Sequence, residues 1–165
     1  MKNITSSKLQ LFVVSFSLII LGISFFLQYF KGLEPCPLCL MQRLCIISIF
    51  LLSAAGLFLH EPMQNKLSLK IQFVFICAGL FFALRQLWLL SLPGDQIPAC
   101  LPGLAVLIHY FPWQDTVHAL FWGSGDCTKV KWTFLGLSLP LWATLYFLFI
   151  GFMNSLIYHK LNHTK

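Results

Sequence analysis

The stretch LQLFVVSFSLIILGISFFLQYF, from Leu9 to Phe30, decides the fold class, because it is 22 residues long and carries no charge. At a rise of about 1.5 Å per residue, a helix of this length crosses a hydrocarbon core of about 30 Å. A cleaved signal peptide is the alternative, but its apolar region would be shorter and a small-x-small cleavage site would follow it. We therefore expect this stretch to be a retained membrane-spanning helix.

Three further apolar blocks follow, at about 40–59, 70–92 and 132–158, the last interrupted by Pro140. In lipid, blocks of this length without polar alternation satisfy their backbone hydrogen bonds as helices and not as barrel strands. Together with a first helix at about 9–30, they predict an all-α membrane protein. We expect a single domain, a four-transmembrane-helix bundle.

The composition supports a membrane protein and excludes other classes. Hydrophobic residues make up 58% of the chain and charged residues 10%, whereas a soluble domain carries about 25% charged residues. A soluble fold of this size could not bury so much apolar surface, and a disordered chain would be far less hydrophobic. The net charge of +6 comes from basic residues that flank the apolar blocks, which indicates membrane flanks and not a nucleic-acid surface.

The lysines predict the orientation, because positive residues favour the cytoplasmic side of a membrane. They place both termini and the link at about 60–69 in the cytoplasm, and the loops at about 31–39 and 93–131 outside. Within the second loop, residues 104–122 are apolar and aromatic, so we expect them to lie in the membrane interface. A lid packed on the bundle is the alternative.

The six cysteines fall into two groups on this topology. Cys45 and Cys77 lie inside apolar blocks, where a thiol is expected to be inert packing. The other four lie in the two outer loops, as is typical of an oxidising compartment, where thiols form disulfides: Cys36, Cys39, Cys100 and Cys127.

Cys36 and Cys39 form a CxxC, which leaves Cys100 and Cys127 as a second pair. A CxxC has the spacing of redox dithiols, and closing so short a loop adds little stability, so a redox role is favoured over structural staples. A zinc site is less favoured, because zinc knuckles use two close pairs. Staples and metal nevertheless stay open as alternatives.

The surroundings of Cys39 favour a particular electron acceptor. Cys39 lies where the second helix is expected to begin, so that unpaired backbone N–H groups favour its thiolate, and Arg43 follows one turn later on the same face. Arg43 could lower the pKa of the thiol and donate to a carbonyl oxygen, or could simply anchor the helix end. A thiolate and an arginine at the lipid boundary predict a site for a quinone. Arg85, the second charge within a span, is expected to pair with a headgroup or an acid such as Asp95 or Glu34.

At these residues the chain resembles the DsbB family of bacterial inner-membrane disulfide-forming proteins. The similarity covers nearly the whole chain. Its most specific pieces are Glu34-Pro35-Cys36-Pro37-Leu38-Cys39 with Arg43 four residues on, Gly125-Asp126-Cys127, and the run TFLGLSLPLW between Trp132 and Trp142.

The resemblance implies four transmembrane helices, a bound ubiquinone or menaquinone, and a periplasmic partner, the thioredoxin-like oxidase DsbA. It further implies that reduced DsbA attacks the Cys100–Cys127 disulfide at Cys100, that Cys127 then attacks Cys36, and that Cys39 faces the quinone. Arg43 matches the arginine that supports this step in the family. DsbA is itself a strong oxidant at about −120 mV, so a quinone is a suitable electron sink for its reoxidation.

The sequence departs from the family pattern near the quinone, because the residues between Arg85 and Cys100 include no histidine. Leu38 and Gln86 are expected to complete the quinone site, with Ser91 and Gln96 as further polar candidates. Two other readings stay open. One is a vitamin K epoxide reductase-like enzyme, which is disfavoured because its CxxC follows the other cysteine pair, whereas here the CxxC precedes it. The other is a non-catalytic membrane subunit whose disulfides only staple the outer loops.

Overall fold

The computed structural model describes residues 4–32, 35–58, 62–93, 109, 112–128 and 133–163. Four long helices form the bundle: α1 (Ile4–Lys31), α2 (Pro37–Phe58), α3 (Pro62–Ser91) and α6 (Leu139–His163). Each contains a stretch long and apolar enough to cross a membrane. The prediction of an all-α, four-transmembrane-helix bundle is therefore confirmed.

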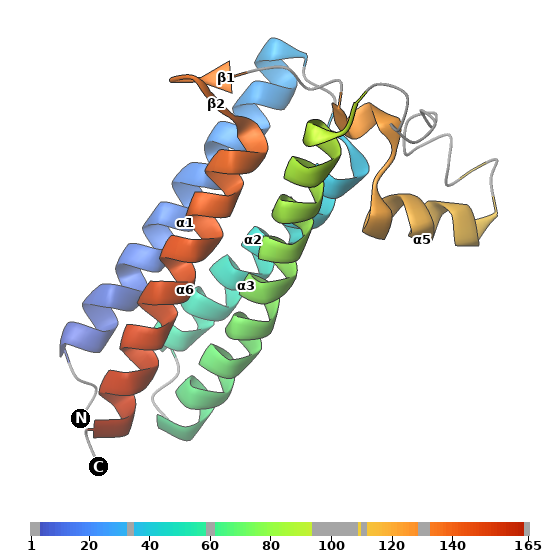
Figure 1. Ribbon diagram of the computed structural model, residues 1–165. Coiled ribbons are helices and arrows are strands. Elements are labelled where there is room, and N and C mark those ends of the chain that lie inside the picture. Colours follow the sequence, from blue (N-terminus) through green and yellow to red (C-terminus); the bar gives the residue numbers. More distant parts are fainter. Residues whose placement is uncertain are drawn as a thin grey trace.

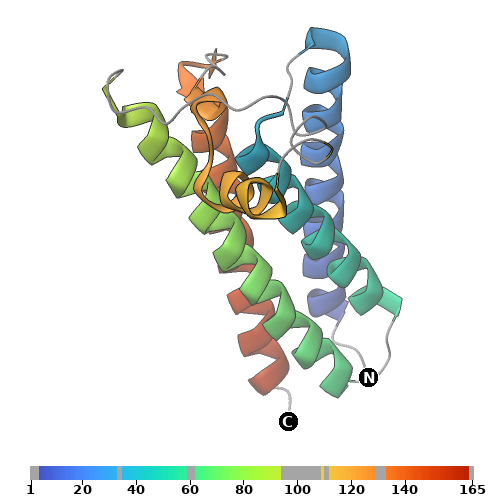
Figure 2. The ribbon, with the colours of Figure 1, turned by 90° about the vertical axis from the view of Figure 1, so that its right-hand side faces the viewer.

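The smaller elements gather at one end of the bundle, and both termini lie at the other (Figure 1). These elements are helix α5 (Trp113–Trp122), the 3-10 turn η2 (Gly125–Thr128), and the two-residue strands β1 (Thr133–Phe134) and β2 (Leu137–Ser138). Helix α2 also begins at this end, so the CxxC lies on the same side as the second loop (Figures 1 and 2). We call it the cysteine end of the bundle.

The last helix begins later than the sequence predicted, at Leu139 and not near residue 132. Residues 133–138 instead form a tight antiparallel hairpin, in which Thr133 pairs with Ser138 and Phe134 with Leu137. Its turn residues, Leu135 and Gly136, have φ of 52° and 79°, the positive values that a two-residue hairpin turn requires. Pro140 does not interrupt the helix, because in the first turn its missing N–H would have had no intrahelical partner.

The link between α2 and α3 is also shorter than expected, because α3 already begins at Pro62. Residues predicted to be cytoplasmic loop, such as Leu67 and Leu69, are therefore helical, and Leu69 is buried. The apolar content of these residues favours packing against the bundle over a solvated loop.

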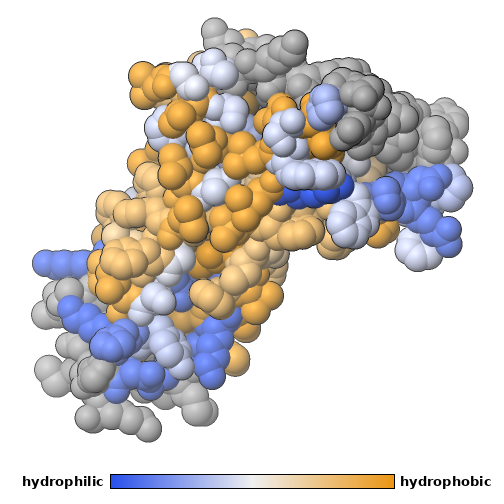
Figure 3. All heavy atoms as spheres, viewed as in Figure 1, coloured by the Kyte–Doolittle hydropathy of each residue, from blue (hydrophilic) through white to orange (hydrophobic). Residues whose placement is uncertain are grey.

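The surface has the pattern expected of a protein solvated by lipid. Large side chains such as Phe12, Ile19, Phe73 and Leu148 are exposed along the helices. In Figure 3 apolar side chains cover the middle of one face, while hydrophilic ones gather near the termini. Exposing so many apolar side chains to water would be unfavourable. In a membrane it is not, because lipid hydrocarbon tails are equally apolar.

The helices are held together by close packing and by a few buried polar pairs. A Cβ at Gly79 of α3 would lie 2.2 Å from the ring of Phe147 in α6, so glycine allows these helices to approach. Ser17 and Tyr146 join α1 to α6 by a hydrogen bond of 2.7 Å. A second cluster joins α2, α3 and α6 through hydrogen bonds between the side chains of Ser53, Gln72 and Asn154.

Candidate active site

The N-terminus of α2 holds the two sulfurs of the CxxC together. The N–H of Leu40 donates to the Cys36 carbonyl (3.1 Å) and the N–H of Cys39 donates to the Cys36 sulfur (3.4 Å), so Cys36 occupies the helix cap. Pro37 fits the first helical position, where no N–H is needed. Both cysteines are free thiols, with their Sγ atoms 3.0 Å apart. Cys36 is buried, while Cys39 keeps partial exposure.

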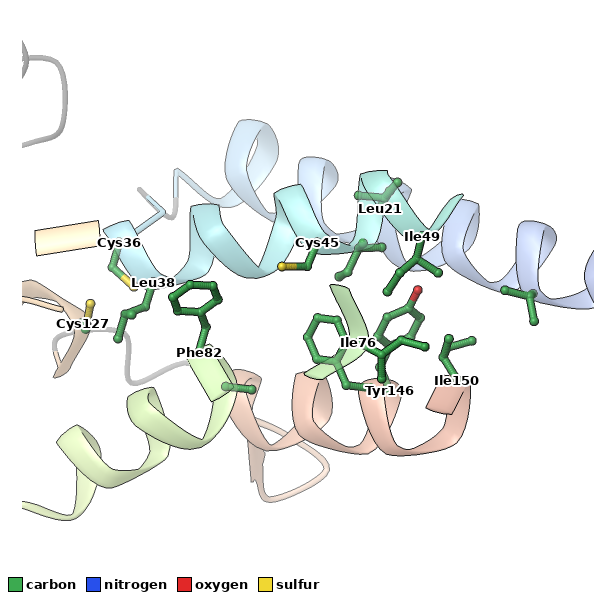
Figure 4. Close-up of a cluster of buried hydrophobic side chains, with 14 of the residues drawn as sticks. Leu21, Cys36, Leu38, Cys45, Ile49, Ile76, Phe82, Cys127, Tyr146 and Ile150 are labelled. Carbon is green, nitrogen blue, oxygen red and sulfur yellow. The ribbon is translucent and has the colours of Figure 1, made fainter. Parts of the chain in front are cut away.

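A third thiol, from the second loop, lies against this pair. Cys127 in η2 is fully buried, and its side chain is hydrogen-bonded to that of Cys36. Figure 4 shows the two residues close together at one end of the apolar core, beside Leu38. This hydrogen bond, the one to Cys39 and burial together raise the pKa of the Cys36 thiol, because each favours the protonated form. Cys100, the predicted partner of Cys127, lies outside the described residues.

A glycine and an arginine fix the approach of η2. Gly123 ends α5, and a Cβ there would lie 2.7 Å from methyl groups of both Leu38 and Leu89, so only glycine allows the chain to pass this close. Arg85 of α3 donates through Nε to the carbonyl of Trp122 (3.2 Å), and its guanidinium lies over the rings of Trp88 and Trp122. The positive charge of Arg85 lies at the C-terminus of α5, the negative end of the helix dipole, and this attraction stabilises the position of α5 against α3.

These contacts of Arg85 had not been predicted, and Asp95 and Glu34, the acids suggested as partners, lie outside the described residues. Helix α5 makes up most of the described part of the segment predicted to lie in the interface. Its Phe121 packs against Phe82 of α3, with ring centroids 5.7 Å apart, while Trp113 is 73% exposed. One side of α5 therefore packs on the bundle and the other faces outward.

The structure places Gln86 and Leu38, both expected at a quinone, in the protein interior. Gln86 is fully buried, and its Nε2 donates to the sulfurs of Cys39 (3.2 Å) and Cys36 (3.5 Å). Its Oε1 accepts a hydrogen bond of 2.8 Å from Gln42 of α2. Leu38 is also fully buried and packs under Gly123. Sequence reasoning missed Gln42, although its position three residues after Cys39 places it on the same helix face.

Arg43 makes its described contacts with α1. Its Nε donates to Ser24 Oγ (3.1 Å), another nitrogen donates to Gln28 Oε1, and its guanidinium lies 4.7 Å from the ring centroid of Phe25. The described hydrogen bonds of Arg43 are thus with α1 and not with Cys39. Arg43 therefore holds α1 against α2, one turn from the CxxC. Its partners on α1 could not be predicted from the sequence around Arg43.

Two other predicted features are simpler. Cys45 is buried in the core, as predicted for a packed thiol, whereas Cys77 is exposed on α3 and is not part of the packing. Among the residues that the structure describes, no three His, Cys, Asp or Glu side chains form a group that could hold a metal ion.

Three thiols gathered at one end of a four-helix membrane bundle define a multi-pass membrane protein built for thiol–disulfide exchange. The family model described as "Disulfide bond formation protein DsbB" matches residues 6–157. The chain therefore belongs to the DsbB family, and with that family it is a disulfide oxidoreductase that takes part in disulfide bond formation.

Individual relatives agree with the family model. The chain is 43% identical to "Disulfide bond formation protein B" of Hahella chejuensis over 135 residues, 81% of this chain and 80% of the relative. It is 36% identical to the protein of that name from Stutzerimonas stutzeri, over 87% of this chain and 90% of the relative, and 39% identical to that from Nitrosococcus oceani, over 82% and 81%. No solved structure matches the chain.

Proposed function

We propose that this protein is a quinone-dependent thiol oxidase of the bacterial inner membrane that reoxidises a periplasmic DsbA-like dithiol oxidase. Electrons pass from the partner to Cys100–Cys127, then to Cys36–Cys39, and finally to ubiquinone or menaquinone. The observation that carries the proposal is the contact between Cys127, from the second loop, and Cys36 of the CxxC.

The exchange steps balance as two-electron transfers. A thiolate of the partner attacks Cys100, which forms a mixed disulfide and releases Cys127 as a thiolate. The Cys127 thiolate attacks the Cys36 sulfur of the Cys36–Cys39 disulfide, so that a Cys36–Cys127 bond forms, the Cys36–Cys39 bond breaks, and Cys39 leaves as a thiolate. The second thiolate of the partner resolves the mixed disulfide, which oxidises the partner and releases Cys100, and Cys100 attacks Cys127 to re-form Cys100–Cys127 and release Cys36. The contact of Cys127 with Cys36 is the arrangement that the attack of Cys127 requires.

The residues around Cys39 fit a quinone site. Cys39 keeps partial exposure, whereas Cys36 and Cys127 are buried, so Cys39 is the thiol that a molecule in the bilayer can reach. Arg43 lies one turn along the same helix, beside α1, and Gln86 supplies an amide donor at the sulfur. When bound, the quinone supplies a two-electron sink; Arg43 would donate to one of its carbonyl oxygens, and Gln86 would line the site from beneath the Cys39 sulfur. Leu38 contributes buried apolar surface beside the CxxC, where it packs against Gly123 (Figure 4).

The orientation follows from the same scheme. The single membrane domain has both termini at one end (Figure 1), and four lysines lie in the helix halves nearest that end: Lys8, Lys66, Lys70 and Lys160. The positive-inside tendency supports a cytoplasmic position for that end, and hence a periplasmic position for the cysteine end. A periplasmic cysteine end is where a soluble thioredoxin-like partner can reach the second loop.

The proposal is tested by mixing the purified protein with a reduced DsbA-like oxidase and a water-soluble quinone. We expect one quinone to be reduced for each partner disulfide formed, and Cys39→Ser to abolish both. Cys77→Ser is the matched control, because it removes an exposed thiol remote from the site and should leave the rate unchanged. If the folded wild-type protein leaves the quinone oxidised in the presence of reduced partner, the protein is not this enzyme. The alternative of a non-catalytic subunit with disulfide-stapled loops would then be favoured.

A further inference from the structure

Two buried glutamines join α2 to α3 directly beneath the CxxC, and the function described so far assigns only one of them. We propose that Gln42 is a positioning residue, which acts through Gln86 to keep an amide N–H donor on the sulfurs of Cys36 and Cys39. The inference deepens the proposed function, because Cys39 is the leaving thiolate of the exchange step.

The orientation of the Gln86 carboxamide decides its effect. A carboxamide has a donor end and an acceptor end, and only the donor end stabilises a thiolate. Gln42 Nε2 donates to Gln86 Oε1 at 2.8 Å, which engages the acceptor end. The donor end then faces the two sulfurs, at 3.2 Å from Cys39 Sγ and 3.5 Å from Cys36 Sγ.

The same geometry shows what would happen without Gln42. The Cys39 thiol can itself donate to Gln86 Oε1, at a distance of 3.6 Å. If Gln86 lost its bond to Gln42, its amide could rotate and turn this oxygen fully toward the thiol. The pair would then favour the protonated thiol over the thiolate. Gln42 therefore sets which form of Cys39 the site prefers, without touching the sulfur.

Burial makes the contact strong. Gln86 is fully enclosed and Gln42 is 6% exposed, so water competes little for these hydrogen bonds. An amide also stabilises a negative sulfur without adding a second charge to the apolar environment, where charged side chains are costly. Helix-to-helix bonding alone does not require a sulfur partner, because Gln72, also on α3, joins the helices through hydrogen bonds with Ser53 and Asn154.

The test measures the reactivity of Cys39 without any quinone, so its result is separate from that of the turnover assay. In a background with Cys36→Ser, Cys100→Ser and Cys127→Ser, the alkylation rate of Cys39 by iodoacetamide is followed against pH by peptide mass spectrometry. We expect Gln86→Met to slow alkylation at neutral pH about tenfold, the size of one hydrogen bond to a charged group, and to move the pH midpoint upward.

The pairing with Gln42 gives the decisive comparison. Gln42→Met should reproduce most of that loss, and the double variant should be no slower than Gln86→Met alone, because Gln42 acts only through Gln86. Gln42→Glu keeps a hydrogen bond between the helices, but a carboxylate only accepts hydrogen bonds. It should therefore draw the N–H donor of Gln86 away from the sulfurs and slow the alkylation of Cys39 further. Gln72→Met, the matched control, should leave the pH profile unchanged.

Two results would overturn the inference: a Gln42→Met variant with the parent pH profile, or additive losses in the double variant. Far-ultraviolet circular dichroism of each variant shows that the helices remain. A normal alkylation pattern with no quinone reduction by the wild-type protein would instead reject the proposed function and leave the amide pair standing.

Discussion

Gly123→Ala should release Cys127 from the CxxC, because Gly123 is where the second loop passes closest to the bundle. The residue has φ of 79° and ψ of 169°, a region that only glycine enters readily. A new Cβ would also lie 2.7 Å from a methyl group of Leu38 and 2.7 Å from one of Leu89. Both leucines are fully buried, so neither can move aside without disturbing the core.

The expected size of the effect follows from these two contributions. Backbone strain of this kind costs about 1–3 kcal/mol, and overpacking of a dense core costs about as much again. At roughly 1.4 kcal/mol for each factor of ten, a combined cost of about 3 kcal/mol lowers the equilibrium constant for docking of the loop about a hundredfold. The cheapest relaxation is for η2 to lift away, and Cys127 moves with it.

The assay is formation of a Cys36–Cys127 disulfide in a background with Cys39→Ser and Cys100→Ser. Under a mild oxidant we expect Gly123→Ala to form this bond at least tenfold more slowly than the parent, as read on non-reducing gels. Gly136→Ala is the matched control, since Gly136 has the same φ of 79° but nothing within 4 Å of a Cβ. Equal rates of disulfide formation for Gly123→Ala and the parent would refute the reasoning.

Three further predictions concern other contacts. Arg85→Leu removes the donor to the Trp122 carbonyl, so protease cleavage within α5 should become severalfold faster, and an unchanged rate would contradict the anchoring role. Tyr146→Phe removes the hydrogen bond to Ser17 and should lower the free energy of unfolding in detergent by about 0.6 kcal/mol, the average for such bonds in membranes, while quinone reduction is unaffected. Because the pKa of the Cys36 thiol is raised, the folded reduced protein holds this proton more tightly than the unfolded chain does. The stability that this proton contributes should therefore be fully present below the ordinary thiol pKa of 9.0 and fall as pH rises above it. Cys36→Ser should flatten this fall of the unfolding free energy with pH, as measured by equilibrium unfolding.

The extent of each span was read from the sequence with mixed success. The uncharged stretch at about 9–30 lies within α1, and the block at about 40–59 nearly coincides with α2. The stretch at 133–138 was predicted to be helical but forms a hairpin, because apolar residues suit both structures and the left-handed turn at Leu135 and Gly136 decides between them. Periodicity alone carries no signal for such a turn.

The partners of the polar residues were harder to predict. Position within α2 identified Arg43 as important, but its contacts with Ser24 and Gln28 depend on how α1 packs against α2. Gln86 was expected at a quinone, but the sequence did not indicate that its amide lies beneath the sulfurs, where Gln42 meets it. These pairs come from separate helices, and nothing in the local sequence fixes their rotation about one another.

The sequence by itself determined that this chain is a bundle of four membrane helices, because lipid offers no hydrogen bonds and each apolar block must satisfy its own backbone. It also singled out the CxxC at the start of α2, since that spacing is local. Only the tertiary structure decided that Cys127 lies against Cys36, that a glutamine pair lies beneath both sulfurs, and that Arg85 holds α5. Such contacts join residues far apart in the chain, and they exist only once close packing has fixed the rotation and depth of every helix.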